Sequence, residues 1–308
     1  MNLKDSPVTQ HCFHGQRFYL KRDDLLHGHF NGNKARKFYS LLTEPAPKVT
    51  RLIGWGSAQA NSLTALAALA CVKGWKLTFY VDHKPHWLDK KPIGNYRTAL
   101  ELGAEIISLT ELLGKEAPHP QDYIEATHGQ DPECLIVPEG GRSTIAKPGI
   151  DLLAAEILDW ARLNNEGKPL KVALPSGTGT TALFLAQTLQ PNGIEVLTCP
   201  CVGGKEYLKT QFRQLGQFDH TPTILELDYK HHFGKLYPAD YEIWTELQQQ
   251  THIEFDLLYD PMMWQCLLEW QSHHPDHTLL YIHQGGLLGN ESMVARYERD
   301  LGARVLGC

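Results

Sequence analysis

The sequence has no apolar stretch long enough to cross a membrane. Its longest apolar run, residues 63–72, is about half of the ~20 residues that a transmembrane helix needs, and its many alanines are typical of a buried helix. The N-terminal segment MNLKDSPVTQHCFHG has neither the apolar core of a signal peptide nor the Arg- and Ser-rich composition of a transit peptide. We therefore expect no membrane association and a cytoplasmic location.

Neither positive nor negative residues are in large excess. There are 29 Lys and Arg against 35 Asp and Glu, a net charge of −6, and basic residues do not cluster among aromatic ones. Such a chain has no electrostatic footprint for a nucleic acid, so we expect no nucleic-acid partner. The hydrophobic and charged fractions, 42% and 21%, are those of a folded globular protein.

Cysteines are few, odd in number and irregularly spaced, which excludes a disulfide framework. Cys199 and Cys201 are the one close pair, and no second pair lies at zinc-finger spacing, so we expect no metal site. Reduced, mostly buried thiols are expected instead. The seven are Cys12, Cys71, Cys134, Cys199, Cys201, Cys266 and Cys308.

Short β-branched or aromatic segments alternate with helical patterns along most of the chain. This alternation predicts an α/β fold of open, twisted, mostly parallel sheets with helices on both faces, and 308 residues indicate about two domains. The predicted strands are 17–21, 51–55, 77–81, 105–109, 135–138, 171–174, 195–198, 223–227 and 279–283. The predicted helices are 60–73, 96–102, 150–163, 180–189, 241–250, 261–271 and 292–300. Helix 150–163 carries a broad apolar stripe that should face a core.

Four glycine-rich loops span residues 29–34, 54–62, 176–181 and 283–289. The last three each follow a predicted strand. Ligands bind at the carboxyl edge of an open α/β sheet, so these loops can converge on one site.

The third loop joins a strand to a helix and offers backbone N–H groups and hydroxyls to an anion. Its residues are Gly177, Thr178, Gly179, Thr180 and Thr181. With Ala182 it also matches the dinucleotide pattern G-x-G-x-x-A, but the next strand ends Leu197-Thr198-Cys199, without the acidic residue that would hold a ribose. A nucleotide P-loop is excluded because no Gly-Lys-Ser/Thr follows. A phosphate on a smaller cofactor fits best, and a turn that needs glycine only for its geometry stays open.

Two segments near the N-terminus, Tyr19-Leu-Lys-Arg-Asp-Asp-Leu25 and Asn31-Gly-Asn-Lys-Ala-Arg-Lys37, carry a resemblance. They resemble the lysine region of the 1-aminocyclopropane-1-carboxylate deaminase/D-cysteine desulfhydrase family of fold-type-II pyridoxal-phosphate enzymes, where K-R-[DE]-D-L precedes G-N-K-x-R-K. Further motifs follow in the family's order over nearly the whole chain. They are Gln59-Ala-Asn61, Pro138-Glu-Gly-Gly141, the SGTGTT loop, Tyr259-Asp260 and His283-Gln-Gly-Gly286.

The resemblance implies two domains with pyridoxal 5'-phosphate between them, related to the tryptophan synthase β fold. A small domain, 40–145, would be inserted into a large cofactor-binding domain formed by 1–39 and 146–308. The implied activity is deamination or β-elimination of a small amino acid to a 2-oxo acid and ammonia. A homodimer is the usual state of the family.

Lys34 would bind the cofactor covalently and then remove the α-proton of the substrate. Its amine must be neutral to attack an aldehyde, and the neighbouring charges of Arg36 and Lys37 would lower its pKa. The alternative is a solvated lysine in a basic turn. Lys37, on the same helical face, would meet the cofactor phosphate, and the alternative is an exposed helix charge.

By the same resemblance Asn61 would bind the hydroxyl of the cofactor ring. It is also a candidate cap for the helix that begins there, and both roles can hold together. The start of that helix, with Gln59, Ala60, Asn61 and Ser62, would receive the substrate carboxylate. Asp260 would lie against the pyridine nitrogen and keep it protonated, unless it caps the helix beginning at Pro261.

Tyr259 would be the acid or would orient the substrate. The chain also departs from the family pattern: alanine stands at position 60, where the family has a serine, so steps that need that hydroxyl, such as cyclopropane ring opening, lose their proton carrier. The family's aromatic position after H-F-G corresponds to Lys235, with Tyr237 close by, and Pro261-Met262 replaces a Gly-Lys pair. Two other functions stay open, a pyridoxal-phosphate-binding protein without lyase activity and a dinucleotide-dependent oxidoreductase.

Overall fold

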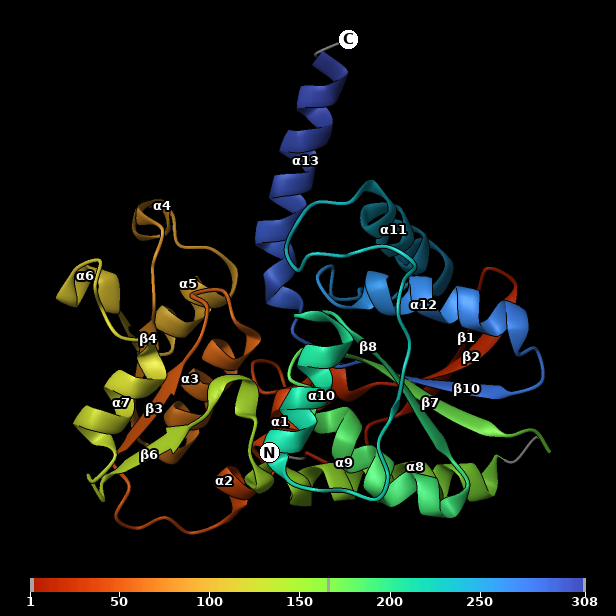
Figure 1. Cartoon of the computed structure of the whole chain (residues 1–308), viewed down its shortest axis with the longest axis horizontal. Helices are drawn as coiled ribbons and strands as arrows, with labels where there is room; N and C mark the ends of the chain where they lie inside the picture. Colours follow the sequence, from red (N-terminus) through yellow and green to blue (C-terminus); the bar gives the residue numbers. More distant parts are fainter. Residues whose placement is uncertain (1–2, 165–166, 307–308) are drawn as a thin grey trace.

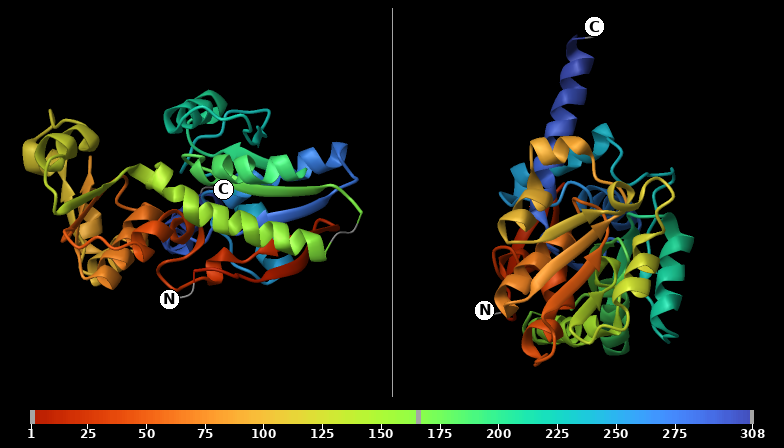
Figure 2. Two further views of the ribbon diagram at one scale, coloured as in Figure 1. Left: turned by 90° about the horizontal axis from the view of Figure 1, so that it is seen from below. Right: turned by 90° about the vertical axis from the view of Figure 1, so that its left-hand side faces the viewer.

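The structure, a computed structural model, describes residues 3–164 and 167–306. Two sheets lie side by side, and helices surround each of them (Figures 1 and 2). No helix in these two ranges is long and apolar enough to cross a membrane.

Ten strands form the two sheets. They are β1 (Val8–Phe13), β2 (Gln16–Lys21), β3 (Arg51–Trp55), β4 (Lys76–Val81), β5 (Glu105–Ser108), β6 (Cys134–Val137), β7 (Leu170–Ser176), β8 (Glu195–Pro200), β9 (Thr223–Ile224) and β10 (Thr278–Ile282). The larger sheet has the order β1-β2-β10-β7-β8-β9 and the smaller β5-β4-β3-β6. Within the described residues β1 and β2 pair antiparallel and the other neighbours pair parallel, which confirms the predicted α/β class.

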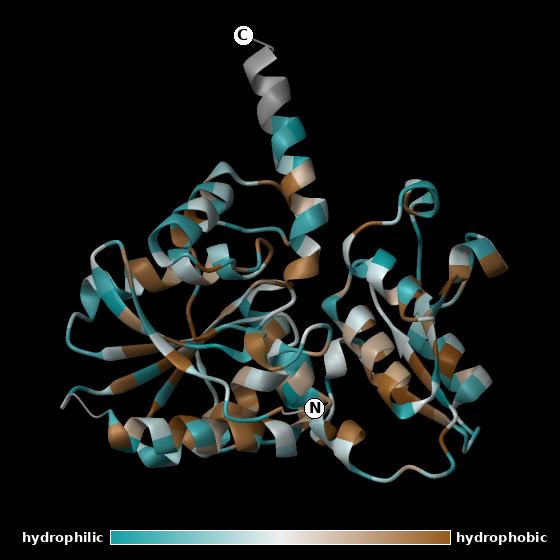
Figure 3. Ribbon diagram, turned by 180° about the vertical axis from the view of Figure 1, so that it is seen from behind, coloured by the Kyte–Doolittle hydropathy of each residue, from teal (hydrophilic) through white to brown (hydrophobic). Residues whose placement is uncertain are grey.

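Helices connect the parallel strands. They are α1 (Gly32–Lys37), α2 (Tyr39–Thr43), α3 (Asn61–Lys73), α4 (His86–Lys90), α5 (Gly94–Glu101), α6 (Leu109–Leu113), α7 (Pro120–His128), α8 (Lys147–Leu163), α9 (Thr180–Leu189), α10 (Gly204–Leu215), α11 (Pro238–Thr251), α12 (Asp260–His273) and α13 (Asn290–Leu306). The long helix α13 points away from both sheets (Figure 3), and its first turns pack through Met293 and Tyr297 against Leu257.

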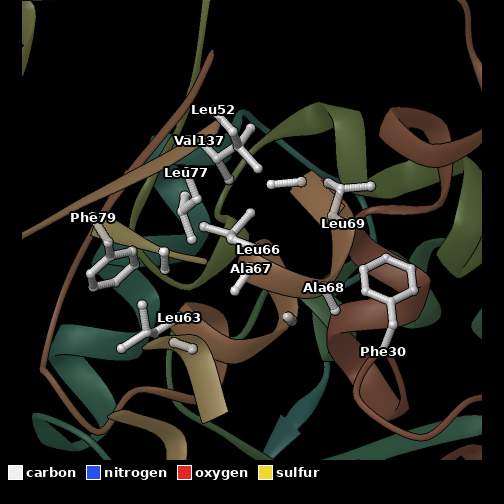
Figure 4. Close-up of a cluster of buried hydrophobic side chains, with 14 of the residues drawn as sticks. Phe30, Leu52, Leu63, Leu66, Ala67, Ala68, Leu69, Leu77, Phe79 and Val137 are labelled. Carbon is white, nitrogen blue, oxygen red and sulfur yellow. The ribbon is translucent and has the colours of Figure 1, made fainter. Parts of the chain in front are cut away.

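Each sheet has a core on both faces. On the larger sheet α8 and α9 cover one face and α11 and α12 the other. The apolar stripe of α8 is buried in the first of these cores, as predicted. On the smaller sheet the alanine-rich α3 packs Leu63, Leu66 and Leu69 over Leu52 and Phe79 (Figure 4). Alanines between these leucines let α3 lie close to the strands.

The strands of the smaller sheet come from residues 51–137, and those of the larger sheet from 8–21 and 170–282. The chain therefore leaves the larger sheet after β2 and returns to it at β7. The predicted domain limits, at residues 39/40 and 145/146, stay a prediction.

Strand β1 lies outside the predicted strands, because its sequence VTQHCF is half polar. It pairs with β2 through a tight turn in which His14 and Gly15 both have positive φ, 48° and 75°. The predicted strand 223–227 is shorter than expected and forms only an edge pair at β9.

The cysteine prediction holds only in part. All six cysteines in the described residues are free, but three of them are buried rather than most. The buried ones are Cys199, Cys201 and Cys266, and the others are Cys12, Cys71 and Cys134. Cys308 lies outside the described residues.

Candidate active site

All the residues predicted for the site line one cavity of about 380 Å³. It lies where the loops after β3, β7 and β10 meet, at the carboxyl ends of parallel strands. The predicted residues that line it are Lys34, Lys37, Gln59, Ala60, Asn61, Ser62, Gly177, Thr178, Gly179, Thr180, Thr181, Tyr259 and Asp260. Segments far apart in the sequence thus form one site.

A second cavity, of about 450 Å³, adjoins the first. The two share Asn33, Lys34, Asn61 and Gln284 as lining residues. Lys34 therefore lies where they meet.

Lys34 projects from the short helix α1. The helix begins at Gly32, whose φ of +59° and close approach to the loop after β10 require glycine, since a Cβ there would lie 1.6 Å from the Gln284 carbonyl oxygen. Lys34 Nζ donates a hydrogen bond to the Gly140 carbonyl at 3.3 Å. Burial lowers the Lys34 pKa to about 8, against the opposing charge of Glu139. The alternative of a fully solvated lysine is therefore wrong.

Arg36 does not act on Lys34 as expected. Its side chain is fully buried on the other side of α1, where the guanidinium binds Asp23 at 2.8 and 2.9 Å and Glu156 at 2.7 and 2.8 Å. Two carboxylates neutralise its charge. Desolvation, rather than Arg36, is what lowers the Lys34 pKa.

Lys37 is only 3% exposed, so the alternative of a surface charge is wrong. Its Nζ donates to the Gly140 carbonyl at 3.0 Å and to Thr178 Oγ1 at 3.4 Å, which places it beside the loop after β7. Burial and then the positive charges of Lys34 and Arg142 hold the Lys37 pKa well below its ordinary value. Among the described residues no carboxylate pairs with it, so it can still bind an anion.

The loop after β7 leads into the N-terminus of α9. Gly179 is the N-cap residue with φ +70°, and any Cβ there would lie 2.4 Å from Leu208 and Phe212. Thr178 and Thr180 share a hydrogen bond between their hydroxyls at 3.1 Å. The buried Thr181 hydroxyl has no hydrogen-bond partner. With Lys37, the N–H groups at the start of α9 and this hydroxyl are donors that an anion could accept from.

Asn61 does not cap α3 with its side chain. The N-cap residue is Ala60, and Asn61 Oδ1 instead accepts from Asn95 Nδ2 at 2.9 Å, while Asn61 Nδ2 donates to Asp256 Oδ2 at 3.4 Å. Gln59 donates to the Ile93 carbonyl at 3.0 Å, and its Oε1 is buried without a partner. The alternative role of Asn61 as a cap is therefore wrong, and its amide is held at the cavity wall.

Asp260 is the first residue of α12 but does not cap it. Its carboxylate accepts from the Tyr281 hydroxyl and from the Asp256 backbone N–H at 2.8 Å, so the capping alternative is wrong. Burial raises the Asp260 pKa. Burial, with the charge of Asp256, also raises the pKa of Tyr259, so its phenol stays protonated and can donate a hydrogen bond.

The position matched to the family's aromatic residue, Lys235, does not reach the cavity. Lys235 packs over the ring of Tyr237 at 5.4 Å, and neither is among the lining residues. Phe233, two residues earlier, lines the cavity with its ring 5.1 Å from that of Tyr259. The H-F-G segment therefore contacts the cavity through Phe233.

Two carboxylates in the cavity wall are absent from the predicted set. Glu139 lies inside the quoted Pro138-Glu-Gly-Gly141 motif, which could have signalled it. Asp256 lies in an irregular turn, and no spacing in the sequence marks it. One of its hydrogen bonds is to Asn61, 195 residues away.

Two curated proteins and several solved structures are similar to this chain. No protein-family model matches the chain. A Thermotoga maritima protein named "Putative 1-aminocyclopropane-1-carboxylate deaminase" is 27% identical over 295 residues, 90% of each chain. The D-cysteine desulfhydrase of Serratia proteamaculans is 25% identical over 178 residues, 57% of this chain and 54% of that protein.

Solved structures agree on the fold. One described as an ACC deaminase homologue has a TM-score of 0.75 at 20% identity and covers 95% of this chain and 92% of its own. Another, described as a threonine deaminase, has a TM-score of 0.65 at 16% identity and covers 91% of this chain and 92% of its own. These comparisons confirm the resemblance and the fold predicted from the motifs.

Proposed function

We propose that this chain, as a relative of the 1-aminocyclopropane-1-carboxylate deaminase/D-cysteine desulfhydrase family, is a pyridoxal-phosphate-dependent deaminase or lyase acting on a small amino acid. Its products would be a 2-oxo acid and ammonia. The observation that carries the proposal is the convergence of Lys34, the anion site after β7 and Asp260 on one cavity. The names of the two curated relatives support the same class of reaction.

The residues present fit pyridoxal phosphate. The unpartnered Thr181 hydroxyl, the start of α9 and Lys37 would hold the phosphate. When bound, this cofactor supplies a conjugated ring that delocalises the electron pair left when the substrate α-carbon loses its proton. Asp260 would stay against the ring nitrogen, and the Asn61 amide would bind the ring hydroxyl.

The other residues divide the work on the substrate. Lys34 would hold the cofactor and later carry the α-proton, which needs an amine whose pKa lies near neutrality. The phenol of Tyr259, kept protonated by its surroundings, would give a proton to the leaving group. The N-terminus of α3, with Gln59 and Ser62 beside it, would receive the substrate carboxylate.

Ala60 limits the chemistry of the site. It lines the cavity where the resemblance places a serine, and its methyl group neither donates nor accepts a proton. The proton carriers that we assign to the substrate are therefore Lys34 and Tyr259, and neither replaces the missing hydroxyl at position 60. We expect β-elimination from substrates with a good leaving group, and no opening of a cyclopropane ring.

The test is the absorbance spectrum of the purified protein after incubation with pyridoxal phosphate, followed by assays of ammonia and 2-oxo acid. D-cysteine, L-cysteine, D-serine and 1-aminocyclopropane-1-carboxylate are compared. We expect visible absorbance that hydroxylamine bleaches, and product from a cysteine or serine but not from the cyclopropane. Absorbance without product from any amino acid would instead identify a binding protein, and nicotinamide binding without absorbance would identify an oxidoreductase.

Lys37→Met is expected to weaken pyridoxal-phosphate binding by about 10- to 100-fold, the usual worth of a hydrogen bond between charged groups. The apo protein should become more stable at neutral pH, because a lysine whose pKa is lowered on folding costs stability at every pH below its ordinary pKa. Cofactor titration and urea unfolding measure the two effects. The control Lys48→Met removes an exposed lysine outside the cavity and should change neither.

A further inference from the structure

The turn before α12 contains a buried carboxylate that no motif identifies. Asp256 is 3% exposed and lines the cavity. Its Oδ1 accepts from the backbone N–H of Leu258 at 2.7 Å and of Tyr259 at 3.0 Å. Asp256 Oδ1 thus holds the backbone of Tyr259, the residue proposed to donate a proton to the leaving group.

The other oxygen reaches across the cavity. Asp256 Oδ2 accepts from Asn61 Nδ2 at 3.4 Å, and Asn61 belongs to α3, which packs on the smaller sheet. Asp256 itself belongs to the half of the molecule built on the larger sheet. This hydrogen bond therefore joins the two halves at the wall of the site.

The turn also fixes Asp260. The Asp256 backbone N–H donates to Asp260 Oδ2 at 2.8 Å, and the Asp256 carbonyl accepts from the Asp260 N–H at 3.2 Å. Moving the turn would move Tyr259 and Asp260 together. A displacement of about 1 Å in a catalytic group can cost two orders of magnitude in rate.

We propose that Asp256 is a positioning residue: its carboxylate holds Tyr259 and Asn61 in one arrangement across the cavity and, through its backbone, Asp260 as well. The inference rests on the proposed function for the roles of these three residues. It adds a group to which neither the motifs nor the proposed reaction assign a role.

The charge on Asp256 depends on its neighbours. Asp260, from α12, and Tyr259, from the same turn, are the titratable groups that face it, and α3 presents only the neutral Asn61 amide. Asp260 in turn interacts with Tyr281, with His283 just after β10, and with Asp24. Burial and the charge of Asp260 raise the Asp256 pKa to about 7, although the three hydrogen bonds oppose this shift. Asp256 therefore gains its charge as the pH rises through about 7.

The test is Asp256→Asn, which keeps the size of the side chain and one acceptor for the turn but points an NH₂ group at the Asn61 NH₂ group. We expect the variant to keep its cofactor absorbance while kcat falls at least about tenfold and KM changes little. In the wild type kcat should show a rise with pH through about 7 in addition to the one that Lys34 causes near 8, and the variant should lose only the first of these. Asp240→Asn is the matched control, because Asp240 is 5% exposed, bound to His231 and Gln265, and outside the cavity.

The apo protein provides an independent measurement. A carboxyl whose pKa rises on folding makes the protein less stable as pH rises from its ordinary value to about 7, so Asp256→Asn should flatten this decline in urea unfolding. In the double variant Asn61→Asp, Asp256→Asn, the amide at position 256 can donate to the carboxylate at position 61. The double variant should therefore be more stable than the sum of the two single-variant losses predicts.

The proposal is overturned if Asp256→Asn matches Asp240→Asn in kcat and pH profile, or if the two positions show no coupling in the apo protein. Failure of the proposed function has a different signature. The wild type would then form no visible absorbance with the cofactor, while the coupling between positions 61 and 256 would still be measurable.

Discussion

Lys34→Ala is expected to abolish both the visible absorbance formed with pyridoxal phosphate and the release of 2-oxo acid. The side chain lies beside Gly140 where the two cavities meet, and its amine can bond to an aldehyde and then carry a proton. Loss of a positioned general base alone costs about 10²–10⁴-fold in rate, and here the covalent attachment is lost as well. The control Lys48→Ala, outside the cavity, should keep both signals.

The pH dependence of cofactor attachment tests the environment of Lys34. Only the neutral amine attacks the aldehyde, so the rate of colour formation in the apo wild type should rise with pH with a midpoint near 8 rather than near the ordinary lysine value of 10.5. Glu139→Gln should move the midpoint to lower pH, because the Glu139 charge raises the Lys34 pKa. A midpoint above 10, or colour in Lys34→Ala, would assign the attachment to a different lysine.

The site could be predicted from the sequence because its residues follow parallel strands. The loops after β3, β7 and β10 must meet at one edge of the fold, and their Gly, Ser, Thr and Asn residues already distinguish them in the amino-acid sequence. Lys34 and Lys37 lie three residues apart on a helix, which places both side chains on one face. Such local geometry is visible in a sequence.

Contacts between distant segments are not visible in this way. Arg36 is expected from its spacing to act on its neighbour Lys34, but its partner Glu156 lies 120 residues away on α8 and takes it to the opposite side of α1. The position of Phe233 depends on how an irregular segment lies over Tyr259. In each case a tertiary contact, rather than spacing along the chain, decides where the side chain points.

The helices also differ in whether local spacing or tertiary contacts determine them. Helices α3, α8 and α9 have apolar residues at helical spacing, and their predicted ends lie within about three residues of the observed ones. Helix α1, of sequence GNKARK, has no such spacing. It is stabilised by what packs around it, since so short a segment cannot form a stable isolated helix.

The packing that stabilises α1 depends on Arg36, and Arg36→Met is expected to lower the free energy of unfolding by about 3–5 kcal/mol, the usual effect of breaking a buried ion pair. The arginine is fully buried and holds Asp23, which is 1% exposed, together with Glu156, whose side chain is 8% exposed. Methionine has a similar volume but leaves both carboxylates without the N–H donors of the guanidinium. Urea unfolding at neutral pH measures the loss.

The matched control is Arg97→Met, which breaks an ion pair to Glu291 of the same 2.7 Å length. Both side chains of that pair are more than a third exposed, so the expected loss is below about 1 kcal/mol. If the two variants lost the same free energy of unfolding, burial would not be the reason why Arg36 stabilises the fold.

The pH dependence separates a lost ion pair from lost packing. Burial raises the Glu156 pKa, but the bonds and charges of Arg36 and Lys21 outweigh it, so the net pKa is lowered. The stability that Glu156 gains from these partners is present above its ordinary pKa and disappears as pH falls through the lowered value. The difference in the free energy of unfolding between the wild type and Arg36→Met should therefore become smaller below about pH 4. A difference caused by lost packing would not change with pH. Because α1 also carries Lys34 and Lys37, the variant should bind pyridoxal phosphate more weakly even where it is folded.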